Sequence, residues 1–262
     1  MKKGYLFLFI LVILSSYVQG QEKVQSIIPD RPDFTDSPNI VPNGFVQIES
    51  GIYFSKEKLN SSNNALEISR IGVMGTVVRV GISELFEIRA GGEYLFETEK
   101  SDVEKIDRKG LNALMIGTKF QFLSSEKSFA DAALMLEFTL PFGSSDYKPE
   151  NAEPLMLLSA AHELYGPVSI TYNLGTQYQS SGDNYLNFYS LNFGISINDR
   201  FGGFIEHYGL VDKQSSPKYY MGAGINYTQD SNLIVDFSFG KEITPNANYW
   251  QIGAGFSLRL PK

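Results

Sequence analysis

The chain has no cysteine, only two histidines and a single tryptophan among its 262 residues. Without cysteine the protein can form neither a disulfide framework nor a lipid anchor on a cysteine, so its stability has to come from hydrogen bonding and packing. There is also no glycine-rich phosphate loop and no His-Glu-x-x-His motif. The sequence therefore predicts no metal site and no cofactor.

Long apolar runs are also scarce, and the one that occurs lies at the start. Lys2 and Lys3 precede an apolar run over residues 5–14, and small or permissive residues stand at Val18 and Gly20. This pattern predicts a signal peptide over residues 1–20 and a mature chain that begins at Gln21, with an uncleaved anchor helix as the alternative. No later apolar stretch approaches the length of a helical membrane span.

Basic residues are fewer than acidic ones. Once Lys2 and Lys3 are removed, 20 basic residues face 29 acidic ones, and the formal charge falls from -7 to -9. This balance argues against nucleic acid as a partner.

What the chain does have is alternation of apolar and polar residues from about residue 44 to residue 260. One clear case is the run Trp250, Ile252, Ala254, Phe256, Leu258, which alternates with Gln251, Gly253, Gly255, Ser257 and Arg259. Twelve such segments can be marked: 44–54, 70–82, 86–97, 111–122, 130–142, 155–165, 168–179, 185–198, 202–210, 218–228, 232–240 and 248–260. The stretches near 70–76, 155–164 and 202–210 fit the alternation poorly, so about 10 to 14 strands are compatible with it.

The connections between these segments alternate in length. Those at 83–85, 166–167, 199–200 and 229–231 are short, and 123–129 is nearly so, whereas 55–69, 98–110 and 143–153 are long and polar. Outer-membrane barrels have short periplasmic turns and long outer loops. The sequence thus predicts an all-β, transmembrane, antiparallel up-and-down barrel over residues 44–262, with about 12 strands, in the outer membrane of a Gram-negative-type bacterium, and with both termini in the periplasm.

A soluble β-protein would show the same period with the opposite face buried. Here the polar face is rich in Gly, Ser, Asn and Gln, and aromatic residues gather near the strand ends. Both features favour a barrel surrounded by outer-membrane lipids. In the last strand this places Phe256 and Leu258 toward lipid and Ser257 toward the lumen.

The last strand also resembles the terminal signal read by the barrel-assembly machinery. The match consists of a polar residue, a glycine and two apolar residues at Gln251, Gly253, Phe256 and Leu258. The chain departs from that signal by ending in Pro261-Lys262 without a terminal aromatic residue. The resemblance implies the assembly machinery as a partner.

Residues 21–43 form a polar leader that four prolines keep out of regular structure. Its charged and polar block contains Asp30, Arg31, Asp33 and Thr35. This block could fold into the lumen as a plug or gate, or it could remain a disordered periplasmic tail.

The block 30–38, followed by 41–44, 47–51, 79–82 and 86–89, resembles the outer-membrane transporter family labelled "MetA-pathway of phenol degradation". The resemblance implies an outer-membrane barrel that takes up small molecules. The label says little about which solute passes.

Strand parity predicts a charged lumen, because the opposite parity would place these charges in lipid at about 2–4 kcal/mol for each midplane Arg or Lys. The residues concerned are Glu49, Arg79, Glu87, Arg89, Glu93, Lys119, Glu137, Asp236 and Arg259. They could form a constriction that selects solutes. Alternatively, they could be a salt-bridged interior that fills a narrow barrel.

Catalysis is not expected, since neither His162 nor His207 is followed by the serine found in barrel lipid hydrolases. A membrane-embedded hydrolase is therefore the least favoured of three functions. The favoured function is passive passage of small solutes, including aromatic or partly apolar ones. The second is a non-conducting structural or surface-interaction barrel with a filled lumen.

Overall fold

The computed structural model describes residues 26–61, 64–125 and 128–262, and within these ranges the only regular elements are β-strands. None of the described residues forms a helix that is long and apolar enough to span a membrane. The strands are β1 (Phe45–Ser61), β2 (Asn64–Gly81), β3 (Phe86–Lys100), β4 (Lys105–Leu111), β5 (Met115–Leu123), β6 (Asp131–Thr139), β7 (Glu153–Tyr165), β8 (Val168–Gln179), β9 (Asn184–Ser196), β10 (Phe201–Val211), β11 (Lys218–Asp230), β12 (Leu233–Glu242) and β13 (Tyr249–Pro261).

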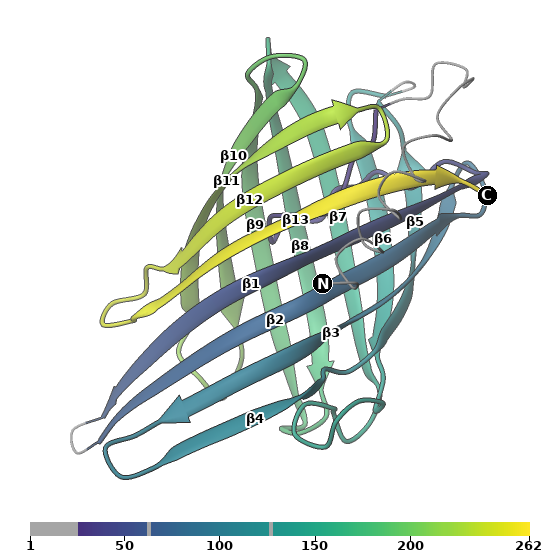
Figure 1. Ribbon diagram of the computed structural model, residues 1–262. Helices are drawn as coiled ribbons and strands as arrows, with labels where there is room; N and C mark the ends of the chain where they lie inside the picture. Colours follow the sequence, from purple (N-terminus) through teal and green to yellow (C-terminus); the bar gives the residue numbers. More distant parts are fainter. Residues whose placement is uncertain (1–25, 62–63, 126–127) are drawn as a thin grey trace, which may run out of the picture.

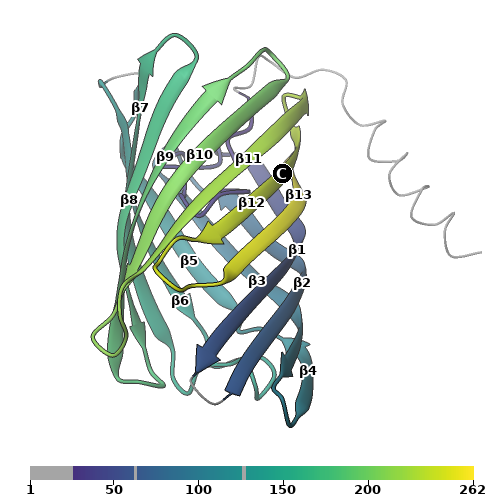
Figure 2. The same cartoon turned by 90° about the vertical axis from the view of Figure 1, so that its left-hand side faces the viewer.

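The strands form one closed antiparallel barrel, tilted as Figures 1 and 2 show. Consecutive strands pair with each other except for β4 and β5, β13 pairs with β1, and the β2–β3 pairing completes the ring. Strands β4 and β5 share one edge of β3: β4 pairs with Tyr94–Lys100 and β5 with Phe86–Gly91. The ring is therefore a twelve-strand barrel, which confirms the predicted fold class.

The predicted long loops are only partly right. Residues 55–61 and 64–69 continue the β1–β2 ladder, in which Ser55 pairs with Arg70 and Ser61 with Asn64. Residues 98–100 and 105–110 likewise belong to the β3–β4 ladder. The polar composition of both stretches reflects solvated strands, because these hairpins extend beyond the end of the neighbouring β12–β13 hairpin, at the lower left of Figure 1. Only the third predicted loop lies outside the strands, over residues 140–152.

The predicted short turns all lie at one end of the barrel. They connect consecutive strands at 82–85, 124–130, 166–167, 197–200 and 231–232. We call this the turn end and the opposite one the loop end. The C-terminus also lies at the turn end, where the backbone N–H of Lys262 donates to the Gly44 carbonyl at 2.6 Å.

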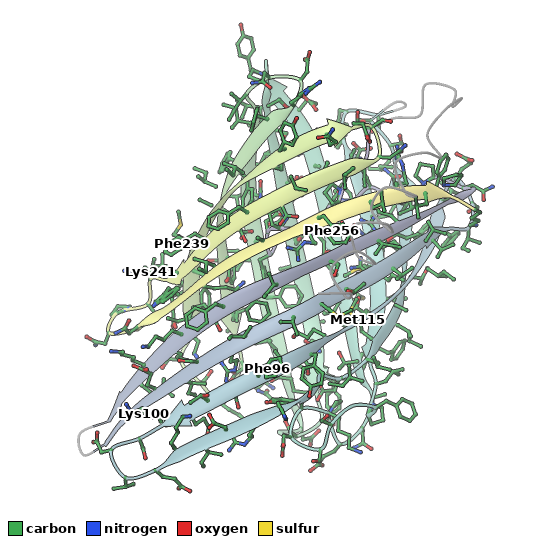
Figure 3. All side chains as sticks on the ribbon, in the orientation of Figure 1. Phe96, Lys100, Met115, Phe239, Lys241 and Phe256 are labelled. Atoms are coloured by element: carbon green, nitrogen blue, oxygen red, sulfur yellow. The ribbon has the colours of Figure 1, made fainter. Side chains whose placement is uncertain are left out.

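The outer surface of the barrel is apolar, as the alternation predicts. Phe96, Phe239 and Phe256, labelled in Figure 3, all keep 40–45% of their surface exposed. Ser257, the neighbour of Phe256, is fully buried. Since lipid surrounds a transmembrane barrel on this side, these exposed aromatic side chains contact lipid, which is favourable for apolar surface.

Two local causes explain the strands that fit the alternation poorly. A β-bulge in β2 shifts its register between Val73 and Thr76 and leaves Met74 exposed with a φ of 53°. A bulge adds a residue and so exchanges the two faces of a strand. In β7 and β10, Leu157 and Phe204 are buried on the inner side, which makes both faces of those strands apolar.

Candidate functional site: the leader inside the barrel

The leader, described from residue 26 onward, enters the barrel and returns at the same end. The backbone N–H of Ile27 donates to the Ser231 carbonyl in a turn-end connection at 3.1 Å. Asn43, at the other end of the leader, forms a bridge with Gly81 just before another such connection. Between these points the chain runs inside the barrel wall, as the purple trace in Figure 2 shows. The leader therefore occupies the half of the lumen next to the turn end.

Asp30 lies among three cations of the barrel wall, which we call the cation triad: Arg79 of β2, Arg89 of β3 and Lys119 of β5. Its Oδ2 lies 3.2 Å from Arg79 Nη1, 2.8 Å from Arg89 Nη1 and 2.9 Å from Lys119 Nζ. All three cationic side chains are at most 5% exposed. Hydrogen bonds between charged groups are among the stronger polar contacts in proteins. Asp30 is thus a main attachment of the leader to the wall.

The triad is also tied to acids of the wall itself. Arg79 binds Glu87 at 2.9 Å and Glu49 at 2.8 Å. Arg89 Nε lies 3.4 Å from Glu137. Glu49 in turn accepts the backbone N–H groups of Asp30 and Arg31.

Two further carboxylates of the wall, on β12 and β10, also bind the leader. Arg31 donates through Nη2 and Nε to both carboxylate oxygens of Asp236 in β12, at 3.0 and 3.3 Å. Glu206 in β10 accepts the Phe34 backbone N–H at 3.0 Å and the Thr35 hydroxyl at 3.1 Å. Among the described residues, all the hydrogen-bond and ion-pair partners of Asp236 and Glu206 belong to the leader.

The leader backbone is held by polar side chains from several strands. Ser159 of β7 and Asn173 of β8 both donate to the Asp36 carbonyl, at 2.7 and 2.9 Å. Lys119 donates to the Ser37 carbonyl at 2.7 Å, and the Val41 N–H donates to Glu87 at 2.8 Å. Asn192 of β9 donates to the Asp33 carboxylate. Contacts with so many strands satisfy backbone groups that burial would otherwise leave unpaired.

An aromatic row continues from the leader along the inner wall; it comprises Phe188, Phe34, Tyr208, Tyr220 and Tyr249. Phe34 stacks on Tyr208 with ring centroids 4.2 Å apart, and Tyr208 stacks on Tyr220 at 4.7 Å. Phe188 and Tyr249 make edge contacts at 5.8 Å with Phe34 and Tyr220, respectively. Each such pair contributes about 0.5–1.5 kcal/mol beyond area burial. Although Phe34 lies inside the barrel, it remains 38% exposed.

The pKa values of the two leader carboxyls nearest the triad, Asp30 and Asp36, are shifted in opposite directions. Burial acts to raise the pKa of Asp30, but the positive charges of Arg79, Lys119 and Arg89 outweigh it and hold this pKa below its ordinary value. Burial, followed by the negative charge of Asp30, raises the pKa of Asp36 to about 7. The triad therefore stabilises one ionised carboxylate, that of Asp30.

The structure brings seven of the nine predicted lumen charges to the leader or its immediate contacts: Glu49, Arg79, Glu87, Arg89, Lys119, Glu137 and Asp236. The other two lie elsewhere inside the barrel. Glu93 accepts a hydrogen bond from Asn112 at 2.9 Å, and Arg259 donates to the Ser231 carbonyl at 3.2 Å. Of the predicted leader residues, Asp30 and Arg31 make ion pairs, and Asp33 and Thr35 make hydrogen bonds.

Several residues that hold the leader were not singled out from the sequence: Ser159, Asn173, Asn192, Glu206 and Tyr208. Glu206 and Tyr208 lie on β10, where the alternation is poor because Phe204 and Leu210 share their inner face. The other three are small polar residues of the kind that lines any barrel lumen. The one available signal was Glu206, since a carboxylate in a spanning strand has to face inward.

A cavity of about 560 Å³ lies at the loop end, beyond the leader. Its lining includes Arg70, Glu97, Glu99 and Arg108. These four form an ion-pair network in which Arg70 binds Glu97 at 2.5 Å and Arg108 binds Glu99 at 2.8 Å. The loop end therefore carries a charged recess, whereas the turn-end half holds the leader.

Both histidines lie away from the leader, paired with tyrosines of neighbouring strands. His162 Nε2 lies 3.0 Å from the Tyr172 hydroxyl, and His207 Nε2 lies 3.0 Å from the Tyr189 hydroxyl. In the described part of the chain, no group of three or more metal-binding side chains is placed to hold an ion.

Comparison with solved structures finds outer-membrane barrels of several kinds. An outer-membrane channel from Pseudomonas putida F1 is similar at a TM-score of 0.58 and 8% identity, with 92% of this chain and 100% of that chain covered. The translocator domain of the autotransporter NalP from Neisseria meningitidis follows at 0.55 and 10% identity, over 84% and 90%. The NanC porin matches at 0.50 and 8% identity, over 80% and 100%. At these identities the likeness establishes the outer-membrane barrel fold.

Sequence comparison identifies the family, which the structural comparison does not. No curated protein matches the chain. One family model does match, over residues 29–260, and the match begins within the leader and ends in the last strand. The chain therefore belongs to the family described as "Putative MetA-pathway of phenol degradation".

Proposed function

We propose that the protein is a passive outer-membrane channel for small solutes and that the leader acts as its internal plug. The observation that carries this proposal is the position of the leader. It fills the turn-end half of the lumen, while a charged recess stands open at the loop end. A plug held by polar contacts can leave and return, because its partners can bind water instead. Family membership supports transport as the activity served by this arrangement.

The orientation belongs to the same proposal. The turn end, with the C-terminus and both ends of the leader, faces the periplasm, and the loop end faces the cell exterior. The support is the general rule that barrels of this class place short turns on the periplasmic side. On this view a solute enters at the recess near Arg108 and meets the leader on its way inward.

The aromatic row favours aromatic or partly apolar solutes. The exposed part of Phe34 and the stacked rings of Tyr208 and Tyr220 offer flat apolar surface inside an otherwise polar lumen. Ring faces bind other rings by offset stacking. The channel itself performs no chemistry in this proposal, and its partners are outer-membrane lipids and the barrel-assembly machinery.

A filled, non-conducting barrel is the second candidate, and one observation favours it. Lys119, Glu206 and Asp236 depend on the leader for all the hydrogen-bond and ion-pair partners described for them. If the leader never leaves, these contacts only stabilise the fold.

Planar-bilayer recordings separate the two candidates. The test compares the wild type with the double variant Phe34→Ala/Thr35→Ala, which weakens the leader but leaves every wall charge in place. We expect the variant to conduct more than the wild type, and Lys148→Ala in the 140–152 loop to match the wild type. If both proteins are folded and neither conducts, the channel proposal is wrong and the filled barrel stands.

A further inference from the structure

The cation triad holds a carboxylate that does not belong to the barrel wall. Lys119 Nζ contacts both oxygens of Asp30 at 2.9 Å, and Arg79 and Arg89 share its Oδ2. Arg79, Arg89 and Lys119 come from three different strands, and all are buried. The site is thus built by the wall and occupied by the leader.

The wall acids equal the triad in number, but they do not contact all three of its cations. Arg79 has Glu49 and Glu87, and Arg89 has Glu137. Among the described residues, however, Lys119 finds its hydrogen-bond and ion-pair partners only in Asp30 and the Ser37 carbonyl of the leader. A buried ammonium without a partner is costly. Without Asp30, the Lys119 ammonium would therefore have no carboxylate partner among the described residues.

We propose that the triad is a binding site for the carboxylate of a small monocarboxylate solute, and that Asp30 is its built-in competitor. The side-chain group of Asp30 has the same atoms and charge as the carboxylate of a free acid, so the same three cations can bind either one. A solute that takes the place of Asp30 removes one attachment of the leader, while the contacts to Asp236 and Glu206 remain. The inference rests on the proposed function in that the solute has to reach the lumen.

Chemical rescue of an emptied site tests the proposal in the full-length, detergent-solubilised protein. Asp30→Ala removes the competing carboxylate, and the temperature at which the folded gel band is lost is measured in sodium formate and in sodium chloride of equal ionic strength. We expect formate to raise this temperature by roughly 3 °C or more at about ten times its dissociation constant. The wild type should not shift, since Asp30 already occupies the site.

The double variant Asp30→Ala/Lys119→Met is the matched control and should lose the formate effect. An equal rise in both variants would show a general salt effect and would overturn the site, as would no difference between formate and chloride in Asp30→Ala. Inorganic phosphate in place of formate tests the selectivity for a planar carboxylate, and an effect equal to or larger than that of formate would overturn the assigned ligand class.

If Asp30→Ala does not assemble, Asp30→Ser keeps a polar side chain but leaves the carboxylate position empty, and it should show the same formate effect. If neither assembles, refolding in formate should restore assembly, and failure to do so overturns the proposal. The temperature at which the folded band is lost can be measured whether or not the protein conducts ions. If formate raises the melting temperature but the protein does not conduct, the carboxylate site stands and the channel proposal is wrong. If the protein conducts but formate has no effect, the channel proposal stands and the carboxylate site is wrong.

Discussion

At the scale of single residues, the lumen consists of charges whose partners lie on different segments of the chain. Arg89 shows this most clearly, since it contacts Asp30 of the leader and Glu137 of the wall while its side chain is only 5% exposed. Such a group contributes little by itself, but its removal leaves buried acids uncompensated.

Arg89→Ala should therefore destabilise the folded protein by about 3–5 kcal/mol, because Asp30 and Glu137 remain buried without it. The temperature at which the folded gel band is lost measures this change. Arg108→Ala is the control: its ion pairs lie in the open recess with the Arg108 side chain 31% exposed, so its loss should cost about 1 kcal/mol or less. An Arg89→Ala protein that matches the wild type in stability but differs in ion selectivity would contradict the structural role and indicate a water-filled constriction.

At the scale of single strands, alternate residues face lipid and lumen. In β13, Phe256 is exposed on the outside, and Ser257 is fully buried inside. The sequence predicts that Ser257 tolerates lysine because it faces the lumen. The structure revises that expectation, since no space surrounds Ser257 and a lysine there has to displace its neighbours.

Phe256→Lys should impair assembly, because a lysine on the lipid face costs about 2–4 kcal/mol near the bilayer midplane. Ser238→Lys, on the lumen side of the neighbouring strand β12 and only half-buried, is the matched control and should assemble almost normally. The fraction of each protein that shows the folded, heat-modifiable band after refolding into detergent gives the comparison. Equal damage from both substitutions would refute the assignment of faces in β12 and β13.

Trypsin should cut first in the irregular loops and later in the β1–β2 and β3–β4 hairpins. Lys148 lies in the 140–152 loop and Lys213 in the 212–217 loop, whereas Lys58 and Lys109 belong to the β1–β2 and β3–β4 ladders. Proteases need an extended, unpaired backbone. Mass spectrometry of early fragments from intact cells should therefore show cleavage after Lys148 and Lys213. Early cleavage after Lys109 would mean that the β3–β4 hairpin is not paired in solution.

At the scale of the whole molecule, most of the fold could be predicted from alternation and connection length. Turns such as 166–167 are marked by Gly166 and Pro167, and lipid on the outside makes one face of each strand uniformly apolar. The β2 bulge at Met74 was missed because one inserted residue reverses the pattern without any signal of its own. The outer parts of the β1–β2 and β3–β4 hairpins were missed because a solvated strand and a polar loop have similar composition.

The candidate site could be predicted only in part, for a related reason. Charge parity identified Arg79, Arg89 and Lys119 because a charge cannot face lipid. It could not show that Asp30 binds all three, since Asp30 is separated from them by between 49 and 89 positions in the sequence. The same rule applies to Glu206, but this residue was missed because the inner face of its strand is largely apolar and the alternation there is poor.

The mature protein should begin at Gln21 and migrate as a compact, heat-modifiable band, because a closed hydrogen-bond ladder resists detergent until it is boiled. Residues 1–20 lie outside the described part of the chain, so the signal peptide remains a prediction from the sequence. Intact mass of the purified protein checks the cleavage site. A mass that includes residues 1–20 would contradict cleavage by signal peptidase.

The direct connection of the leader to β1 limits the order in which the protein can be built. Strand β1 forms one side of the last junction of the ring, with β13 on the other side. The wall groups that bind the leader are spread from β1 to β12. The leader, which is synthesised before the strands, therefore acquires its last partner, Asp236, only after nearly every strand is in place. A leader that lies across the junction when β13 arrives would obstruct closure, so the leader has to lie inside the wall before β1 and β13 pair.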